Sequence, residues 1–143
     1  MDTVVPGKTS CGEEGLVRDP AIRVLMMPKD TNGVGTIFGG VILSYIDLAG
    51  AVEARRCYPR IRQLVTVAMD KVEFIAPVFV GDTVSFYGRV LRKGRTSVRV
   101  EVEVEAVRQE DPRERVRVTT AEVVYVSVHP GTNRPVVIEE GEG

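Results

Sequence analysis

The sequence predicts an α+β fold in which a curved antiparallel sheet wraps one long helix. Its 143 residues, of which 43% are hydrophobic, suit a single domain with a sizeable core. Residues 41–52 are apolar nearly all round, which is typical of a buried helix. Residues 98–105 alternate valine with charged side chains, which is typical of a strand with one buried face. Such strands can form a core if their sheet curves around the helix.

The chain before the helix divides into three parts. Residues 1–15 are polar and without periodicity, so they are predicted to be a flexible N-terminal segment, and the domain itself is expected to span residues 16–128. Residues 22–27 are predicted to form a strand that Pro28 stops. The turn-forming residues 30–35 then predict a long loop that leads into the helix.

The helix is predicted to begin at Gly39-Gly40 and to run to about Cys57. Its end is indicated by Tyr58-Pro59, because proline disfavours helical geometry in the residue before it. This gives one helix of four to five turns.

Asp47 is the carboxylate that interrupts the apolar helix. Its neighbours at i±3 and i±4 carry no positive charge; they are Leu43, Ser44, Gly50 and Ala51. An unpaired buried carboxylate costs several kcal/mol in practice. A group kept at such a cost suggests chemistry, although a position at the helix end, an orientation toward solvent or an arginine from another strand would also explain it.

After the helix the signal changes to period two. Besides residues 98–105, β-rich stretches cover about 64–75, 83–91 and 116–128. Turn-forming residues separate them at Gly81-Asp82, Lys93-Gly94 and Asp111-Pro112. These strands predict an antiparallel meander, followed by a flexible C-terminal tail at residues 129–143.

Composition excludes several classes of protein. A net charge of -1 and a pI near 5.9 give no reason to expect nucleic acid or an anionic membrane as a partner. No apolar stretch is long enough to span a bilayer, and no signal peptide is recognisable. The two cysteines, Cys11 and Cys57, form no disulfide framework or zinc motif, which fits a reducing cytoplasm. The expected location is therefore cytoplasmic.

Histidine is scarce, and this limits the possible chemistry. His129 is the single histidine and stands next to Pro130-Gly131, where a surface turn is expected. A Ser-His-Asp triad, a two-histidine metal site and a hydratase with a histidine base all require a well-placed imidazole. Hydrolysis that relies on a carboxylate, a helix-dipole amide and an asparagine remains open, and such chemistry requires no metal or cofactor.

Residues 27–40, MPKDTNGVGTIFGG, followed by Asp47, resemble the signature of YciA-type acyl-CoA thioester hydrolases, which have the hotdog fold. The similarity continues through residues 65–67, 74–82 and 93–97, and so covers roughly residues 20–128. It implies a central helix in a curved antiparallel sheet, which is the architecture that periodicity predicts independently. It also implies hydrolysis of acyl-CoA to a free acid and coenzyme A.

The resemblance assigns roles to four residues. It makes Asp47 the catalytic carboxylate, acting as general base or as nucleophile through an anhydride, and the sequence leaves both routes open. It makes Asn32 a polar partner near the thioester, although asparagine in such a loop commonly serves the backbone. It makes the backbone N–H of Gly39 or Gly40 the oxyanion donor, since a helix N-terminus has unsatisfied N–H groups and a favourable dipole.

The spacing of these residues adds a prediction about assembly. Gly39 and Asp47 are eight residues apart, so a helix separates them by about 12 Å, whereas reacting atoms must approach to ~3–3.5 Å. The two groups of one site are therefore expected to come from different subunits of a homodimer, with antiparallel helices at a two-fold interface. The resemblance further implies hexamers built as trimers of dimers.

The hairpin Lys93-Gly94-Arg95-Thr96-Ser97 is the candidate coenzyme A site. Its cations, hydroxyls and glycine turn could hold phosphates, and the resemblance also implies contact with the nucleotide. An exposed hairpin collects such residues without binding anything, so this alternative stays open.

The sequence is also compatible with two other functions. A noncatalytic acyl-CoA-binding module would keep the basic hairpin and the dimer but would not need Asp47. Dehydration of an acyl-CoA on the same fold is disfavoured by the missing histidine.

Overall fold

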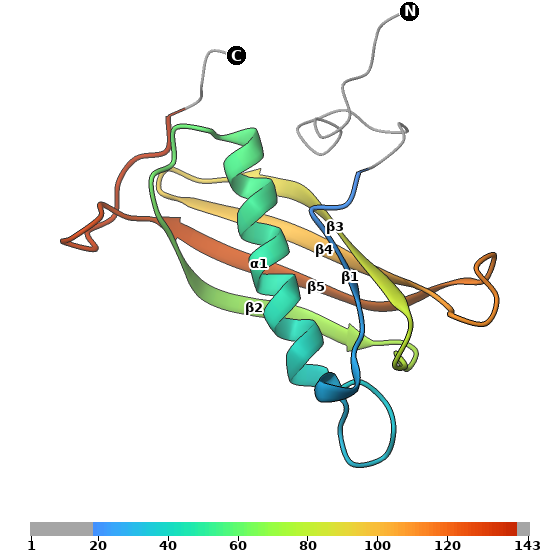
Figure 1. Ribbon diagram of the computed structural model, residues 1–143. Helices are drawn as coiled ribbons and strands as arrows, with labels where there is room; N and C mark the ends of the chain where they lie inside the picture. The colour runs from blue at the N-terminus through green and yellow to red at the C-terminus, as the bar shows by residue number, and fades with distance from the viewer. Residues whose placement is uncertain (1–18, 140–143) are drawn as a thin grey trace, which may run out of the picture.

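The computed structural model describes residues 19–139 and contains one long helix and one five-stranded antiparallel sheet. The strand order is β1-β3-β4-β5-β2, and Figure 1 shows α1 lying across one face of the sheet. The elements in chain order are β1 (Ile22–Leu25), the short 3-10 helix η1 (Pro28–Asp30), α1 (Gly39–Cys57), β2 (Leu64–Phe74), β3 (Thr83–Lys93), β4 (Ser97–Val107) and β5 (Arg115–Ser127). The predicted α+β fold is confirmed.

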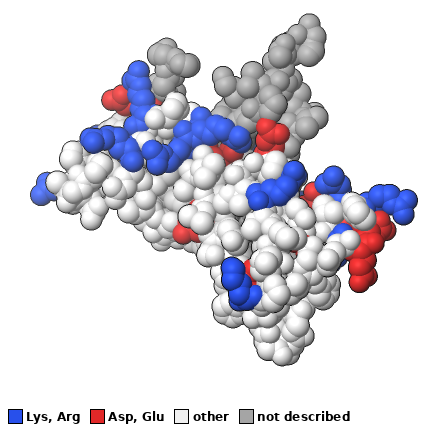
Figure 2. All heavy atoms as spheres, in the orientation of Figure 1, with Lys and Arg blue, Asp and Glu red and all other residues white. Residues whose placement is uncertain are grey.

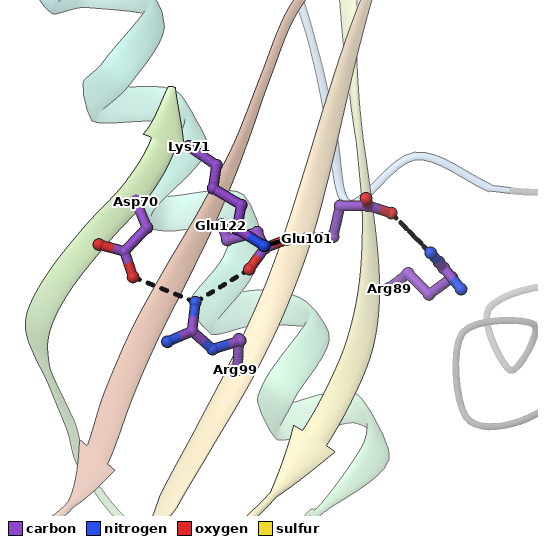
Figure 3. Close-up of polar contacts among 6 residues, drawn as sticks. All are labelled: Asp70, Lys71, Arg89, Arg99, Glu101 and Glu122. Atoms are coloured by element: carbon purple, nitrogen blue, oxygen red, sulfur yellow. Dashed lines mark hydrogen bonds and ion pairs between the residues drawn. The ribbon is translucent and has the colours of Figure 1, made fainter. Parts of the chain in front are cut away.

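The alternation in β4 decides which face of the sheet meets the helix. Val98, Val100, Val102 and Val104 are each at most 1% exposed and belong to the core. The intervening charged residues lie on the opposite face, where they pair with neighbouring strands. Figure 3 shows two examples, Arg89 with Glu101 and Arg99 with both Asp70 and Glu122. These pairs lie on the polar face of the sheet, whereas the valines of β4 pack toward the helix.

Helix α1 is only partly covered by its own sheet. Ile42, Ile46 and Ala49 are buried against the strands, whereas Leu48 is 57% and Val52 45% exposed. The apolar run that predicted a fully buried helix therefore has one face that residues 19–139 leave partly exposed. Leu48 and Val52 are four residues apart and share this face, and exposed apolar side chains that lie together can mark an interface.

The loop before α1 is held by Asp30, which is 8% exposed. Its carboxylate accepts a hydrogen bond from the Met27 backbone N–H at 3.0 Å and one from Lys29 Nζ at 3.1 Å, and its carbonyl accepts one from Phe38 N–H at 2.9 Å. The backbone bond, and then the lysine bond, lower the pKa of Asp30 against the opposing effect of burial. The charged form of Asp30 therefore stabilises the entrance to the helix.

We expect Asp30→Asn to lower the melting temperature at neutral pH by an amount corresponding to about 1–2 kcal/mol, because a charged acceptor is lost. A folded-state pKa below the unfolded value of about 3.9 means that the stabilisation is present above this pH and is lost as pH falls through the folded value. Melting curves of variant and wild type should therefore converge at strongly acidic pH. The exposed Glu110→Gln is the control, and a constant difference at every pH would contradict the assignment.

The chain after β5 packs on the domain as far as Glu139. His129 N–H donates to Arg134 O, Val136 N–H to Ser127 O, and Ile138 N–H to Arg95 O, each within 2.9 Å. Ile138 is 3% exposed. The expected flexible tail is thus incorrect for residues 129–139, because a buried isoleucine and backbone bonds anchor them to the sheet. The expected flexible segment 1–15 lies outside the described residues.

Neither membrane-spanning helices nor disulfides were expected from the sequence. Within residues 19–139, no helix is long and apolar enough to cross a membrane. Cys57 is disulfide-bonded, which the cysteine count did not predict, and Cys11 lies outside the described part of the chain.

Candidate active site

The N-terminus of α1 opens into a pocket of about 370 Å³. Gly39 lines it, together with Thr36, Ile37, Ile42, Phe74, Ile75, Ala76, Pro77, Val78 and Thr119. The side chains are largely apolar, while the first N–H groups of a helix have no partner within the helix and carry its positive dipole end. The pocket therefore combines an apolar lining with backbone donors at one place.

Backbone hydrogen bonds fix this end of the helix. Ile37 N–H donates to Val78 O at 2.8 Å, and Phe38 N–H donates to Asp30 O at 2.9 Å. Phe38 is the N-cap residue, with extended backbone angles of φ -63 and ψ 132. A Cβ on Gly39 would lie 3.3 Å from the Phe74 ring, so glycine leaves room here for a ligand to approach the backbone.

Asp47 lies two turns further along α1 and is half-buried. The Thr66 hydroxyl, from β2, donates a 2.6 Å hydrogen bond to Asp47 Oδ1. The fully buried carboxylate of the helix is instead Glu53, which is 0% exposed and pairs with Arg56. The expectation that Asp47 is a buried, unpaired carboxylate is therefore wrong in its burial, and β2 supplies a neutral hydroxyl partner that local sequence cannot reveal.

Asn32 organises the loop in front of the helix. Its Oδ1 accepts hydrogen bonds from Val34 N–H at 2.8 Å and Thr36 N–H at 3.2 Å, and its Nδ2 donates to Thr36 Oγ1 at 2.7 Å. Thr36 in turn lines the pocket. Asn32 thus serves the backbone, as the alternative interpretation of its turn-rich surroundings predicted, and places a pocket residue while doing so.

Among residues 19–139, the pocket at the helix N-terminus does not bring these groups together. Gly39 lines the pocket, whereas Asp47 and Asn32 do not. Both Gly39 and Asp47 belong to the same unbroken helix, so the rise between them is about 12 Å. Gly40 is exposed and faces Phe38, whose ring would lie 2.7 Å from a Cβ at position 40.

The hairpin of residues 93–97 connects β3 and β4 at the end of the molecule opposite the N-terminus of α1. Gly94 N–H donates to Ser97 O at 2.7 Å, while Thr96 O and Arg95 O accept from Ser127 and Ile138. The hairpin is therefore held by β5 and by the C-terminal segment, with the Arg95 side chain exposed.

Basic side chains gather at this end of the molecule, where Figure 2 shows a band of Lys and Arg. A pocket of about 210 Å³ lies next to the hairpin, and its lining includes Arg60, Arg62 and His129. Arg60 also pairs with Glu139 at 2.9 Å. The hairpin is thus part of a larger basic surface rather than an isolated basic turn.

Thr66, which bonds the Asp47 carboxylate, is not among the candidate site residues predicted from the sequence. A single threonine in a strand has no distinctive pattern, and Thr66 stands out only as a member of the matching stretch 65–67. Its strand register is what identifies it. Thr66 pairs with Tyr125 across the β2–β5 ladder, and cross-strand partners share a face of the sheet. That register exists only once the sheet has formed.

Comparisons with known proteins agree with this architecture. The thioesterase superfamily profile matches residues 34–112. The YciA acyl-CoA thioester hydrolase of Escherichia coli K12 is 40% identical over 124 residues, which is 85% of this chain and 92% of that protein.

Solved structures add the same fold. A hexameric hotdog-fold thioesterase of Campylobacter jejuni is 47% identical with a TM-score of 0.77, covering 85% of this chain and 90% of that one. HI0827, a hexameric broad-specificity acyl-coenzyme A thioesterase solved as an aspartate-to-alanine mutant, is 36% identical with a TM-score of 0.80, covering 87% and 88%. The expected hotdog fold is confirmed, and the chain belongs to the thioesterase superfamily and, within it, to the YciA-type acyl-CoA thioester hydrolases.

Proposed function

We propose that this protein hydrolyses acyl-CoA thioesters to a free carboxylic acid and coenzyme A, with Asp47 as the catalytic carboxylate. The observation that carries the proposal is the pairing, on one helix, of an N-terminus open to an apolar pocket and a half-buried carboxylate held by Thr66. The apolar lining suits an acyl chain, and the N-terminal amides suit the negative charge that develops on the thioester oxygen.

In the general-base route, Asp47 removes a proton from water as the water oxygen attacks the thioester carbon. The resulting oxyanion is stabilised by the N–H of Gly39 or Gly40, and it collapses by expelling the coenzyme A thiolate, which takes up a proton. In the nucleophilic route, Asp47 attacks the carbon and expels the thiolate, and water then hydrolyses the anhydride. The hydrogen bond from Thr66 orients the carboxylate in either route.

Asn32 is proposed to position water or the substrate near the thioester. Within residues 19–139, its amide nitrogen donates to Thr36 Oγ1. An asparagine amide nitrogen carries two N–H donors, so the second can be given to substrate or water.

The active unit in this proposal is a homodimer, in which the carboxylate of one subunit faces the helix N-terminus of the other. The separation of about 12 Å along the helix requires two chains. The uncovered side chains of Leu48 and Val52 provide an apolar face for such a contact. Because both structural relatives described above are hexameric, we further propose a hexamer built from three dimers.

Coenzyme A is proposed to lie along the hairpin Lys93-Gly94-Arg95-Thr96-Ser97. The neighbouring Arg60 and Arg62 extend the positive surface over which phosphates can bind. No metal or cofactor takes part in the proposed reaction, in which coenzyme A belongs to the substrate.

The test is thiol release from a panel of short- to long-chain acyl-CoAs, together with direct measurement of binding. We expect catalytic turnover, and the panel gives the chain-length preference. Binding of acyl-CoA without turnover on any chain would instead favour a noncatalytic binding module.

A further inference from the structure

The hydroxyl of a buried tyrosine reaches the main chain of α1 at Asp47. Tyr125, in β5, is 1% exposed, and its hydroxyl donates a hydrogen bond to the backbone carbonyl of Asp47. In a helix the N–H of residue i+4 bonds to the carbonyl of residue i. The phenol therefore bonds to a carbonyl within the helix and ties β5 to α1 at Asp47.

Gly50 makes room for this hydroxyl. A Cβ at position 50 would lie 2.2 Å from the Tyr125 oxygen and 3.1 Å from two of its ring carbons. Glycine inside a helix costs about 1 kcal/mol relative to alanine. Its presence beside Asp47 is explained by the approach of the tyrosine.

Tyr125 acts together with Thr66. The two residues face each other across the β2–β5 ladder, and the register shifts directly after Thr66. Thr66 bonds the carboxylate of Asp47, while Tyr125 bonds its main-chain carbonyl. Neighbouring positions of two strands thus hold the side chain and the backbone of the same helical residue.

The phenol hydroxyl of Tyr125 stays protonated at neutral pH, so it remains a hydrogen-bond donor. Burial raises the pKa of Tyr125 far above its usual value, and the charge and hydrogen bonding of Asp47 raise it further against the opposing bond from Ala51. The hydroxyl consequently keeps its proton and its bond to the Asp47 carbonyl.

We propose that Tyr125 is a positioning residue. Its hydrogen bond fixes the position of α1 relative to the sheet at Asp47, and the rotation of the helix about its axis, so that the carboxylate reaches the thioester. The proposal rests on the proposed function, since it requires Asp47 to be the catalytic group. It goes beyond that function by assigning a role to a buried residue of the central sheet that touches no substrate. A misplacement of about 1 Å at a reacting group can cost 10²-fold in rate.

The first test is Tyr125→Phe, which removes the hydroxyl and keeps the ring. We expect kcat to fall by about 10- to 100-fold with little change in KM, in a variant that stays folded by circular dichroism. The acid limb of the pH–rate profile should move, because the surroundings of the Asp47 carboxylate change. Tyr87→Phe is the matched control, because it removes a hydroxyl from β3, and we expect it to retain wild-type kcat and pH profile.

A second pair of variants tests whether the hydroxyl itself matters. Gly50→Ala should reduce kcat strongly, since its methyl group overlaps the Tyr125 hydroxyl. Adding Tyr125→Phe to Gly50→Ala removes the shortest contact and should recover part of the lost kcat. This pair remains informative if Tyr125→Phe alone folds poorly.

Asp47→Asn measured in the same assay separates the two proposals. If Asp47→Asn keeps wild-type turnover, the proposed role of Asp47 fails. If Asp47→Asn is inactive while folded Tyr125→Phe keeps wild-type kcat and pH profile, the positioning role of Tyr125 is overturned and the tyrosine is structural. A fall in the melting temperature of Tyr125→Phe without a change in its kcat would likewise make the tyrosine structural.

Discussion

Asp47→Asn is expected to reduce kcat by about 10²- to 10⁴-fold, the usual contribution of a positioned acid–base group. The substitution keeps the shape of the side chain and an oxygen that can accept the hydrogen bond from Thr66. It removes only the negative charge and the basicity that either catalytic route requires. Thiol release under saturating acyl-CoA measures the effect.

Two controls make this result specific to Asp47. The half-buried position predicts little change in the free energy of unfolding, so the melting temperature should stay close to that of the wild type. Asp19→Asn serves as a neutral acid-to-amide control. Full activity in folded Asp47→Asn would remove this residue from the mechanism.

Gly39→Pro is expected to reduce kcat by about 10²- to 10³-fold, which is the usual cost of removing one oxyanion-hole donor. Proline lacks the backbone N–H but is tolerated at the first helical position. The extended backbone of Phe38, with ψ 132, is the geometry that a following proline prefers. The substitution therefore deletes one donor while the helix can still begin at the same residue.

Gly39→Ala is the matched control for this experiment, because it adds a side chain near Phe74 but keeps the N–H. We expect Gly39→Ala to retain much more activity than Gly39→Pro. If folded Gly39→Pro is as active as Gly39→Ala, and both are close to wild type, the N–H of Gly39 is not needed and the oxyanion is assigned to Gly40. Steady-state kinetics and melting curves of both variants decide between these results.

Mixing the two inactive variants tests the two-subunit site that both predictions assume. In a mixed dimer, the Gly39→Pro chain supplies an intact Asp47 to the intact Gly39 of the Asp47→Asn chain. Random pairing makes about half of the dimers mixed, each with one intact site of two, so about a quarter of wild-type activity should return. Co-expression with two affinity tags would isolate the mixed assemblies, and no recovery in them would place each site within one chain.

Local pattern was sufficient for the elements of the fold. The alternation at residues 98–105 placed its valines on the buried face, and Pro59 marked the end of the helix close to Cys57. Both features depend on neighbours in sequence, through the pleat of a strand and the geometry imposed by proline. The same holds for the separation of Gly39 from Asp47, because the rise of a helix is constant.

The surroundings of Asp47 depended on contacts that local pattern does not contain. Sequence pointed to Asp47 as an unpartnered buried carboxylate, but burial fell on Glu53, and Asp47 received the hydroxyl of Thr66. Nor did polar composition reveal that the chain after His129 is held by Ile138. Each outcome depends on which distant segment packs against the residue.

By itself, then, the sequence determined the helix, the strands, the resemblance to the thioesterases and the spacing that calls for two subunits. Only the tertiary structure decided that Thr66 and Tyr125 meet at Asp47, one at its carboxylate and one at its backbone. The physical reason is that antiparallel pairing of β2 with β5 joins residues far apart in the chain, and Gly50 then lets the phenol approach the helix. Strand register and close packing are properties of the assembled sheet, and no local stretch of sequence carries them.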